Sequence, residues 1–133
     1  DADVMATYFR KLSGSLTGMR TLLLNSNSIG DAGLMAIADA TVFGALGSLE
    51  RFYLDNNAIG DDAMADLSAK MADGSLSKLI FLDLNCNQIG DRGISALASA
   101  VGAGALANLG TLYLHSNRIG DAGLSAFAGC LAP

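Results

Sequence analysis

The sequence predicts an α/β solenoid in which a parallel sheet lines one side and helices line the other. Two observations lead to this prediction. The tripeptide Ile-Gly-Asp recurs every 30 residues, at Ile29–Asp31, Ile59–Asp61, Ile89–Asp91 and Ile119–Asp121. Within each interval, the spacing of apolar residues changes from two, typical of a strand, to three or four, typical of a helix. A unit of this kind buries its apolar side only against neighbouring copies, so the copies are expected to stack.

The first half of each unit is predicted to be a strand. Residues 109–117, for example, read Leu-Gly-Thr-Leu-Tyr-Leu-His-Ser-Asn, in which the leucines at 112 and 114 point to the same face of an extended chain. The closing asparagine recurs in every unit, and its side chain can bind backbone groups that a turn leaves unpaired. We therefore interpret this column as structural: Asn27, Asn57, Asn87 and Asn117.

The second half of each unit is predicted to be a helix. Apolar stripes at helical spacing follow the tripeptides; in unit three the stripe is Ile94, Leu97, Ala98 and Val101, and in unit four it is Leu124, Phe127, Ala128 and Leu131. An aspartate directly before each stripe is expected to cap its own helix: Asp31, Asp61, Asp91 and Asp121. Glycines are expected to end the helices in a left-handed conformation: Gly44, Gly74 and Gly104.

The combined pattern, Leu-x-x-Leu-x-Leu-x-x-Asn-x-Ile-Gly-Asp, resembles the leucine-rich repeat, in the long-repeat subclass of ribonuclease inhibitor. The resemblance implies a short right-handed horseshoe with the sheet on its concave side and the helices on its convex side. Residues 1–133 would form a single domain, with repeats at 16–45, 46–75, 76–105 and 106–133. Residues 1–15 look like a partial repeat whose helix buries Val4, Tyr8 and Leu12.

Charge and cysteine content restrict the partners and the compartment. The net charge is −5 and the eight basic residues are scattered, which argues against nucleic acid as a partner. The uncharged stretch 93–117 contains glycines and polar residues in step with the repeat, so no transmembrane segment is expected. Cys86 and Cys130 occupy different positions of the repeat, one predicted on a strand and one on a helix. Free thiols favour a reducing intracellular compartment, either the cytoplasm or an organelle entered after loss of a targeting peptide.

The concave face is the first candidate partner-binding surface. Side chains between the strand leucines are expected to face outward there, and several are large although no packing reason requires it. Tyrosine and arginine are enriched at binding hot spots. The alternative is that neighbouring aromatic rings merely cover one another on an open sheet. The candidate residues are Arg51, Tyr53, Asp55, Phe81, Asp83, Tyr113, His115 and Arg118.

The ends of the array are the second candidate surface. A solenoid normally finishes in units with a polar outer face, whereas Tyr8, Phe9 and Leu131 make both ends apolar. We therefore expect either a fragment of a longer array or a small subunit of a larger assembly. The acidic helix of unit two is a further possible contact for a basic partner, although a solvated helix face is the more ordinary explanation: Asp61, Asp62, Asp66 and Asp73.

Catalysis is not expected. His115 is the single histidine, which excludes a multi-histidine metal site. A Cys86–His115 dyad is conceivable from the spacing of adjacent strands, but nothing indicates it. No glycine-rich phosphate loop is present, and no cofactor is implied.

A protein–protein interaction scaffold or adaptor is therefore the leading hypothesis for function. One alternative is a structural accessory subunit that is permanently bound in a multiprotein complex. The family resemblance also implies a regulator that inhibits an enzyme or activates a small GTPase. Only Asp55 and Asp83 supply the acidic concave residues expected of such an inhibitor.

Overall fold

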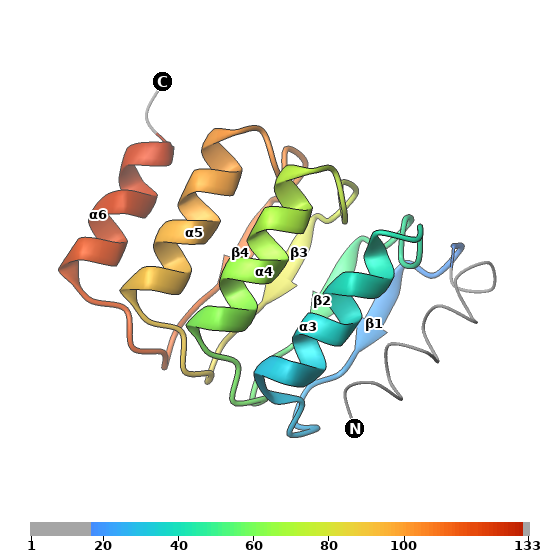
Figure 1. Ribbon diagram of the computed structural model, residues 1–133, viewed down its shortest axis with the longest axis horizontal. Helices are drawn as coiled ribbons and strands as arrows, with labels where there is room; N and C mark the ends of the chain where they lie inside the picture. Colours follow the sequence, from blue (N-terminus) through green and yellow to red (C-terminus); the bar gives the residue numbers. More distant parts are fainter. Residues whose placement is uncertain (1–16, 132–133) are drawn as a thin grey trace.

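The computed structural model describes residues 17–131, which form two layers, one of strands and one of helices (Figure 1). The strands are β1 (Thr21–Leu23), β2 (Arg51–Tyr53), β3 (Phe81–Asp83) and β4 (Thr111–Tyr113). The helices are α3 (Gly30–Thr41), α4 (Asp61–Ala72), α5 (Asp91–Gly102) and α6 (Asp121–Cys130). All strand pairs are parallel and the strand order follows the sequence, β1-β2-β3-β4. The predicted solenoid is confirmed, while the predicted partial repeat at 1–15 lies outside the described residues.

The strands pair in one constant register. Leu22, Phe52, Leu82 and Leu112 are successive Cα partners across the sheet, so the leucine positions of all units point to the same face. A shift of one residue would turn this whole column away from the helices, which is why the alternation specifies the register so strongly. The opposite face of the sheet, which the helices leave uncovered, is called the open face below.

The asparagine column links each unit to the one before it, as predicted. Asn87 Oδ1 accepts hydrogen bonds from the backbone N–H groups of Asn57 and Ile59, both at 3.0 Å. Its Nδ2 donates to the carbonyls of Leu54 and Leu84, both at 3.1 Å. Since the strands are only three residues long, these side chains extend the pairing between units into the loops.

The prediction that each aspartate caps its own helix is wrong. Helices α4, α5 and α6 begin at the aspartate itself, and none of them has a side-chain cap bond. Asp61 Oδ1 instead accepts hydrogen bonds from the next unit, from the N–H groups of Gly90 at 2.7 Å and Gly93 at 2.9 Å. A Cβ on Gly93 would lie 2.6 Å from that oxygen, so the close approach requires glycine there. The aspartates therefore join units, because a side chain at the first helical position points toward the neighbouring turn.

The glycines after the helices adopt the left-handed conformation that was predicted. Gly44, Gly74 and Gly104 have φ angles of 88°, 108° and 101°. This conformation turns the chain back toward the sheet without the steric cost that a Cβ would add.

The two cysteines are free, as predicted, although Cys86 lies in the loop after β3 rather than on the strand. Among residues 17–131, no helix is long and apolar enough to cross a membrane.

The apolar core lies between the sheet and the helices and is not equally covered along the array. In units two and three, the inward side chains are fully enclosed; Phe52, Leu54 and Leu84 are 0% exposed. In unit four, the corresponding Leu112 and Leu114 are only partly buried. The stripe predicted on the last helix does form, but within the described part of the chain no further unit covers it.

Candidate protein-binding surfaces

Three aromatic rings lie in contact on the open face of the sheet. The ring centroids of Tyr53 and Phe81 are 4.9 Å apart with a tilt of 36°, and those of Phe81 and Tyr113 are 5.2 Å apart in an edge-to-face arrangement. The Arg51 guanidinium lies over the Phe81 ring, with its central carbon 5.9 Å from the ring centroid. We call Tyr53, Phe81 and Tyr113 the aromatic strip. It runs across three adjacent strands.

The register of the sheet creates the aromatic strip. Phe81 begins β3, whereas Tyr53 and Tyr113 end β2 and β4, so the rings meet diagonally across neighbouring strands. Asp83 is the direct partner of both tyrosines in the register. Tyr113 remains 46% exposed, and Leu23, at the same strand position in β1, is 62% exposed. The open face therefore offers apolar area beyond what the rings cover among themselves.

The predicted polar residues are near this strip but do not form a reactive cluster. Asp83 Oδ1 accepts a hydrogen bond from the Asn85 N–H at 3.0 Å, so this carboxylate also stabilises the turn after β3. The His115 ring Nδ1 lies 3.0 Å from Ser116 Oγ. Within residues 17–131, no ion pair joins His115 to Asp55 or Asp83.

The conceivable cysteine–histidine dyad is not formed. Cys86 is linked to His115 through the backbone, where its N–H donates to the His115 carbonyl at 2.9 Å. The side chain of Arg118 is exposed on the loop after β4. The described residues contain no group of three or more histidine, cysteine or acidic side chains that could hold a metal ion.

The C-terminal end of the array is a second apolar surface. Leu131, which was predicted to bind a partner, is 65% exposed, and Leu124 is 64% exposed. A hollow of about 280 Å³ opens beside Leu131, between the last helix and the last strand, and is lined mainly by Val101, Leu106, Leu109, Leu112, Phe127 and Leu131. Leu124 was not among the predicted site residues, although its place in the helical stripe signalled it. Tyr8 and Phe9, predicted for the other end, lie outside the described residues.

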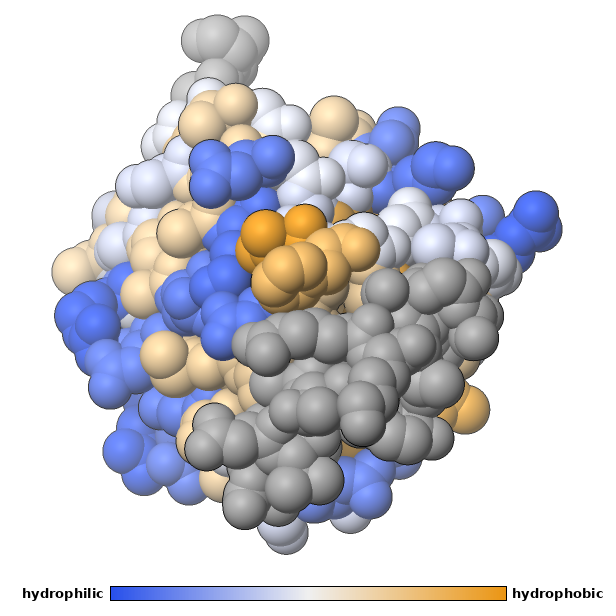
Figure 2. Space-filling view, turned by 45° about the vertical axis from the view of Figure 1, so that its right-hand side comes forward, coloured by the Kyte–Doolittle hydropathy of each residue, from blue (hydrophilic) through white to orange (hydrophobic). Residues whose placement is uncertain are grey.

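A third apolar feature was missed by the sequence reasoning. Val42 and Phe43, directly after α3, are 63% and 60% exposed. Figure 2, which brings the side of the molecule near α3 forward, shows a compact hydrophobic patch with hydrophilic surface along one side of it. No periodic signal marks these residues, because they lie in the turn between helix and strand, where the other units carry smaller or polar side chains.

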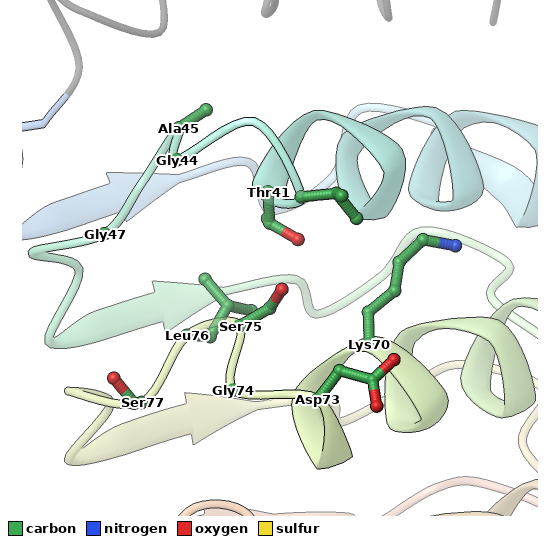
Figure 3. Close-up of a pocket in the computed structure, with 11 residues that line it drawn as sticks. Thr41, Gly44, Ala45, Gly47, Lys70, Asp73, Gly74, Ser75, Leu76 and Ser77 are labelled. Carbon is green, nitrogen blue, oxygen red and sulfur yellow. The ribbon is translucent and has the colours of Figure 1, made fainter.

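A hollow lies between the ends of α3 and α4, and Lys70, which lines it, forms two ion pairs. The volume of the hollow is about 360 Å³, and Lys70 extends along it from α4, with Thr41 and Ser75 nearby (Figure 3). Lys70 Nζ lies 2.7 Å from Asp66 Oδ1 and 2.9 Å from Asp39 Oδ1. Burial lowers the pKa of Lys70, but hydrogen bonds to both carboxylates and their charges outweigh it and raise the pKa above its usual value. Because the ammonium group is already paired, this hollow presents no free cation to a ligand.

Three acidic side chains of the unit-two helix are already engaged, two with the next unit and one within the helix itself. Asp62 pairs with Arg92 at 2.6 Å, and this hydrogen bond raises the pKa of Arg92. Asp61 binds the next unit and Asp66 binds Lys70. These contacts weaken the hypothesis that this helix attracts a basic partner.

Replacing Lys70 with methionine is expected to lower the free energy of unfolding at neutral pH by about 1 kcal/mol, because Asp66 and Asp39 lose their partner. Since the pKa of Lys70 is raised in the folded chain, the ion pairs of Lys70 stabilise the fold fully at pH values below the usual lysine pKa. This stabilisation is lost as the pH rises above about 10 and the ammonium group loses its proton. Urea unfolding of both proteins across this range would show the difference shrinking. An equal loss from Lys78→Met, an exposed control, would contradict the role of the ion pairs.

Comparisons with known proteins agree with the geometry. The family model described as "Leucine Rich repeat" matches residues 17–38, 75–98 and 101–128, together more than half of the chain. Among solved structures, the chain is similar to "Leiomodin-1 Actin-Binding Site 2 (ABS2)", with a TM-score of 0.76 and 19% sequence identity over 97% of this chain and 71% of that one. At this identity the likeness shows the fold, and no curated protein matches by sequence. The chain belongs to the leucine-rich-repeat family.

Proposed function

We propose that this protein is a protein-interaction module that binds its partner on the open face of the sheet. The observation that carries the proposal is the aromatic strip, in which three rings contact one another and Tyr113 remains 46% exposed. Contact between rings fixes their positions before binding, so a partner would order few side chains when it docks. Aromatic rings beside an arginine are the composition typical of binding hot spots.

The same geometry supports the finer parts of the proposal. The units resemble the ribonuclease inhibitor-like subclass in their 30-residue length and in a full helix per unit, and we propose that the chain belongs to it. We further propose that the module is not an enzyme and that its partner is a protein rather than nucleic acid. The net charge of −5 and the scattered basic residues favour a protein partner over nucleic acid. Two free thiols favour a reducing intracellular compartment. The leiomodin-1 structure carries the name of an actin-binding site, so a protein partner is compatible with this fold.

A structural subunit that docks by its end is the second candidate. Leu124 and Leu131, both about two-thirds exposed, favour it because apolar area of this kind is normally covered in a stable assembly. In that case the partner would contact α6 rather than the strip, and the chain would have no separable activity. A fragment of a longer array would use the same end.

The experiment that tests the leading proposal compares Tyr53→Ser/Tyr113→Ser with the wild-type chain as bait in its native extract. The double variant removes two of the three rings of the aromatic strip without altering a core side chain. We expect recovery of the specific partner, quantified by mass spectrometry, to fall about tenfold or more. The matched control is Phe43→Ser, which removes an exposed ring after α3, away from the open face.

The position of the contact is checked independently with a photo-crosslinking amino acid. Placed at Thr21, an exposed open-face residue of β1 far from the C-terminal end, it should crosslink the partner, whereas at Ser99 on α5 it should not. If Tyr53→Ser/Tyr113→Ser still binds the partner and Leu124→Glu/Leu131→Glu does not, the partner binds at the C-terminal end of the array instead of the open face.

A further inference from the structure

Asp83 stands between the two tyrosines of the aromatic strip. In the register of the sheet, its Cα is paired with Tyr53 on one side and with Tyr113 on the other. Phe81 lies two residues earlier on the same strand and the same face, and both tyrosine rings contact it. The tyrosine rings therefore lean toward the start of β3, and the shorter side chain of Asp83 lies between the positions from which they project.

The Asp83 carboxylate has no basic partner among residues 17–131. Its Oδ1 accepts a hydrogen bond from the Asn85 N–H at 3.0 Å, and none of the ion pairs in this part of the chain involves it. Asp83 is only partly exposed, so water screens its negative charge less than it would screen a charge on an open surface. Such a carboxylate is a strong acceptor for a charged donor that a partner brings.

Charge on the open face is divided between the two ends of the strands. Among the side chains that alternation places on this face, the charged ones are Arg51 at the start of β2, Asp83 at the end of β3 and Asp55 shortly after β2. Arg51 lies over the Phe81 ring instead of pairing with Asp83. Asp55 also takes part in none of the ion pairs of the described residues. The side of the open face at the strand ends is therefore negative and complements a positively charged group.

We propose that the partner of the open face binds through an arginine side chain that lies between Tyr53 and Tyr113 and pairs with Asp83. This inference rests on the proposed function and names the group that the aromatic strip recognises. The two tyrosines are two strand spacings apart, about 10 Å, which leaves room for one planar group between their side chains. A guanidinium suits this position because it binds a carboxylate through two N–H groups while its faces contact aromatic rings.

The surroundings of Asp83 favour arginine over lysine and favour apolar side chains beside it in the partner. A lysine ammonium is a compact, strongly hydrated charge that loses water when it enters between two rings, whereas a guanidinium is more weakly hydrated. Leu23, the register partner of Tyr53, extends the apolar surface on the same face and is 62% exposed. The partner segment is therefore an arginine flanked by apolar residues, and Asp55 adds a second negative charge near the guanidinium.

Selection of randomised short peptides displayed on phage, with the full 133-residue chain as bait, tests the proposal without knowledge of the natural partner. Peptides that bind the wild-type chain but not Tyr53→Ser/Tyr113→Ser are expected to share one arginine. In a synthetic copy of the strongest binder, replacing that arginine with citrulline, its uncharged isostere, should weaken binding to the wild-type chain about tenfold or more. Replacing it with lysine should weaken binding less, because the charge is kept and only the planar contacts are lost.

Asp83→Asn and Asp73→Asn are the matched variants of the protein. Asparagine at position 83 keeps an oxygen that accepts the Asn85 N–H, so the turn after β3 is preserved while the charge is removed. The affinities of Asp83→Asn for the arginine and citrulline peptides should lie within about twofold of each other, as the double-mutant cycle requires. Asp73→Asn removes the same charge from an exposed residue directly after α4 and should bind both peptides as the wild-type chain does.

The outcomes separate the arginine site from the proposed function. Peptides that require both tyrosines but share no arginine would overturn the arginine site and leave the binding surface intact. The same conclusion would follow if citrulline weakened binding equally in the wild-type chain and in Asp83→Asn. Failure to select any peptide that requires the tyrosines would count against the open face itself, and therefore against both proposals.

Discussion

Replacing Asn87 with alanine is expected to lower the free energy of unfolding by about 4 kcal/mol, because several buried backbone groups lose their partners at once. The side chain makes five hydrogen bonds that span two units, two as acceptor and three as donor. Asn87 is 7% exposed, so water replaces these bonds poorly. Urea unfolding monitored by circular dichroism measures the loss, which is a large share of the stability of an ordinary domain.

Two controls separate the hydrogen-bond network from a simple change of side chain. Gln88→Ala alters the next residue, whose side chain is exposed, and should change the free energy of unfolding by less than about 0.5 kcal/mol. Asn117→Ala removes the same type of side chain from unit four, where it is only partly buried, and should cost less than Asn87→Ala. Equal losses at Asn87 and Asn117 would show that burial does not set the energy of this column.

Replacing Phe52 with alanine is expected to cost about 4 kcal/mol, through lost apolar burial and the cavity left behind. Phe52 is 0% exposed and stands where the other units have leucine, so its ring fills a space larger than the repeat normally provides. The neighbouring strands are hydrogen bonded on both sides of β2 and can collapse only partly into the cavity. The loss is measured by urea unfolding, as for Asn87.

The repeat itself supplies the matched variants for this position. Phe52→Leu restores the residue found at Leu82 and should cost only about 1 kcal/mol. Leu112→Ala at the same position of unit four should cost less than Phe52→Ala, since Leu112 is already partly exposed. A loss for Phe52→Ala no greater than that for Leu112→Ala would contradict the enclosed core of units two and three.

The fold was predictable from the sequence because several independent sequence patterns indicate the same repeating unit. Strand alternation, helical spacing and the asparagine column all recur at 30 residues, so each unit confirms the register of the others. The hydrogen-bond partners of the aspartates were predicted in their own helices, but they lie in the next unit. Aspartate before an apolar stripe normally indicates a cap, and only the stacking distance shows that Asp61 reaches Gly90 and Gly93 of the next unit.

The candidate surfaces were predictable only in part. Alternation along the strands placed Tyr53, Phe81 and Tyr113 on one face, but it did not determine that the rings touch one another. Residue composition suggested an acidic surface on α4, whereas the structure pairs Asp62 and Asp66 with basic residues of α5 and α4. Val42 and Phe43 gave no periodic signal, because a turn has no repeating geometry that would make their exposure predictable.

The sequence by itself determined the repeat length, the order of the elements and the face on which each strand residue lies. It did so because strand and helix periodicities are local properties, written into every unit. Only the tertiary structure decided which groups meet between units, how closely the aromatic rings pack, and how much of unit four stays open. These depend on distances between residues 30 positions apart in the chain, which are set when one unit stacks upon the next.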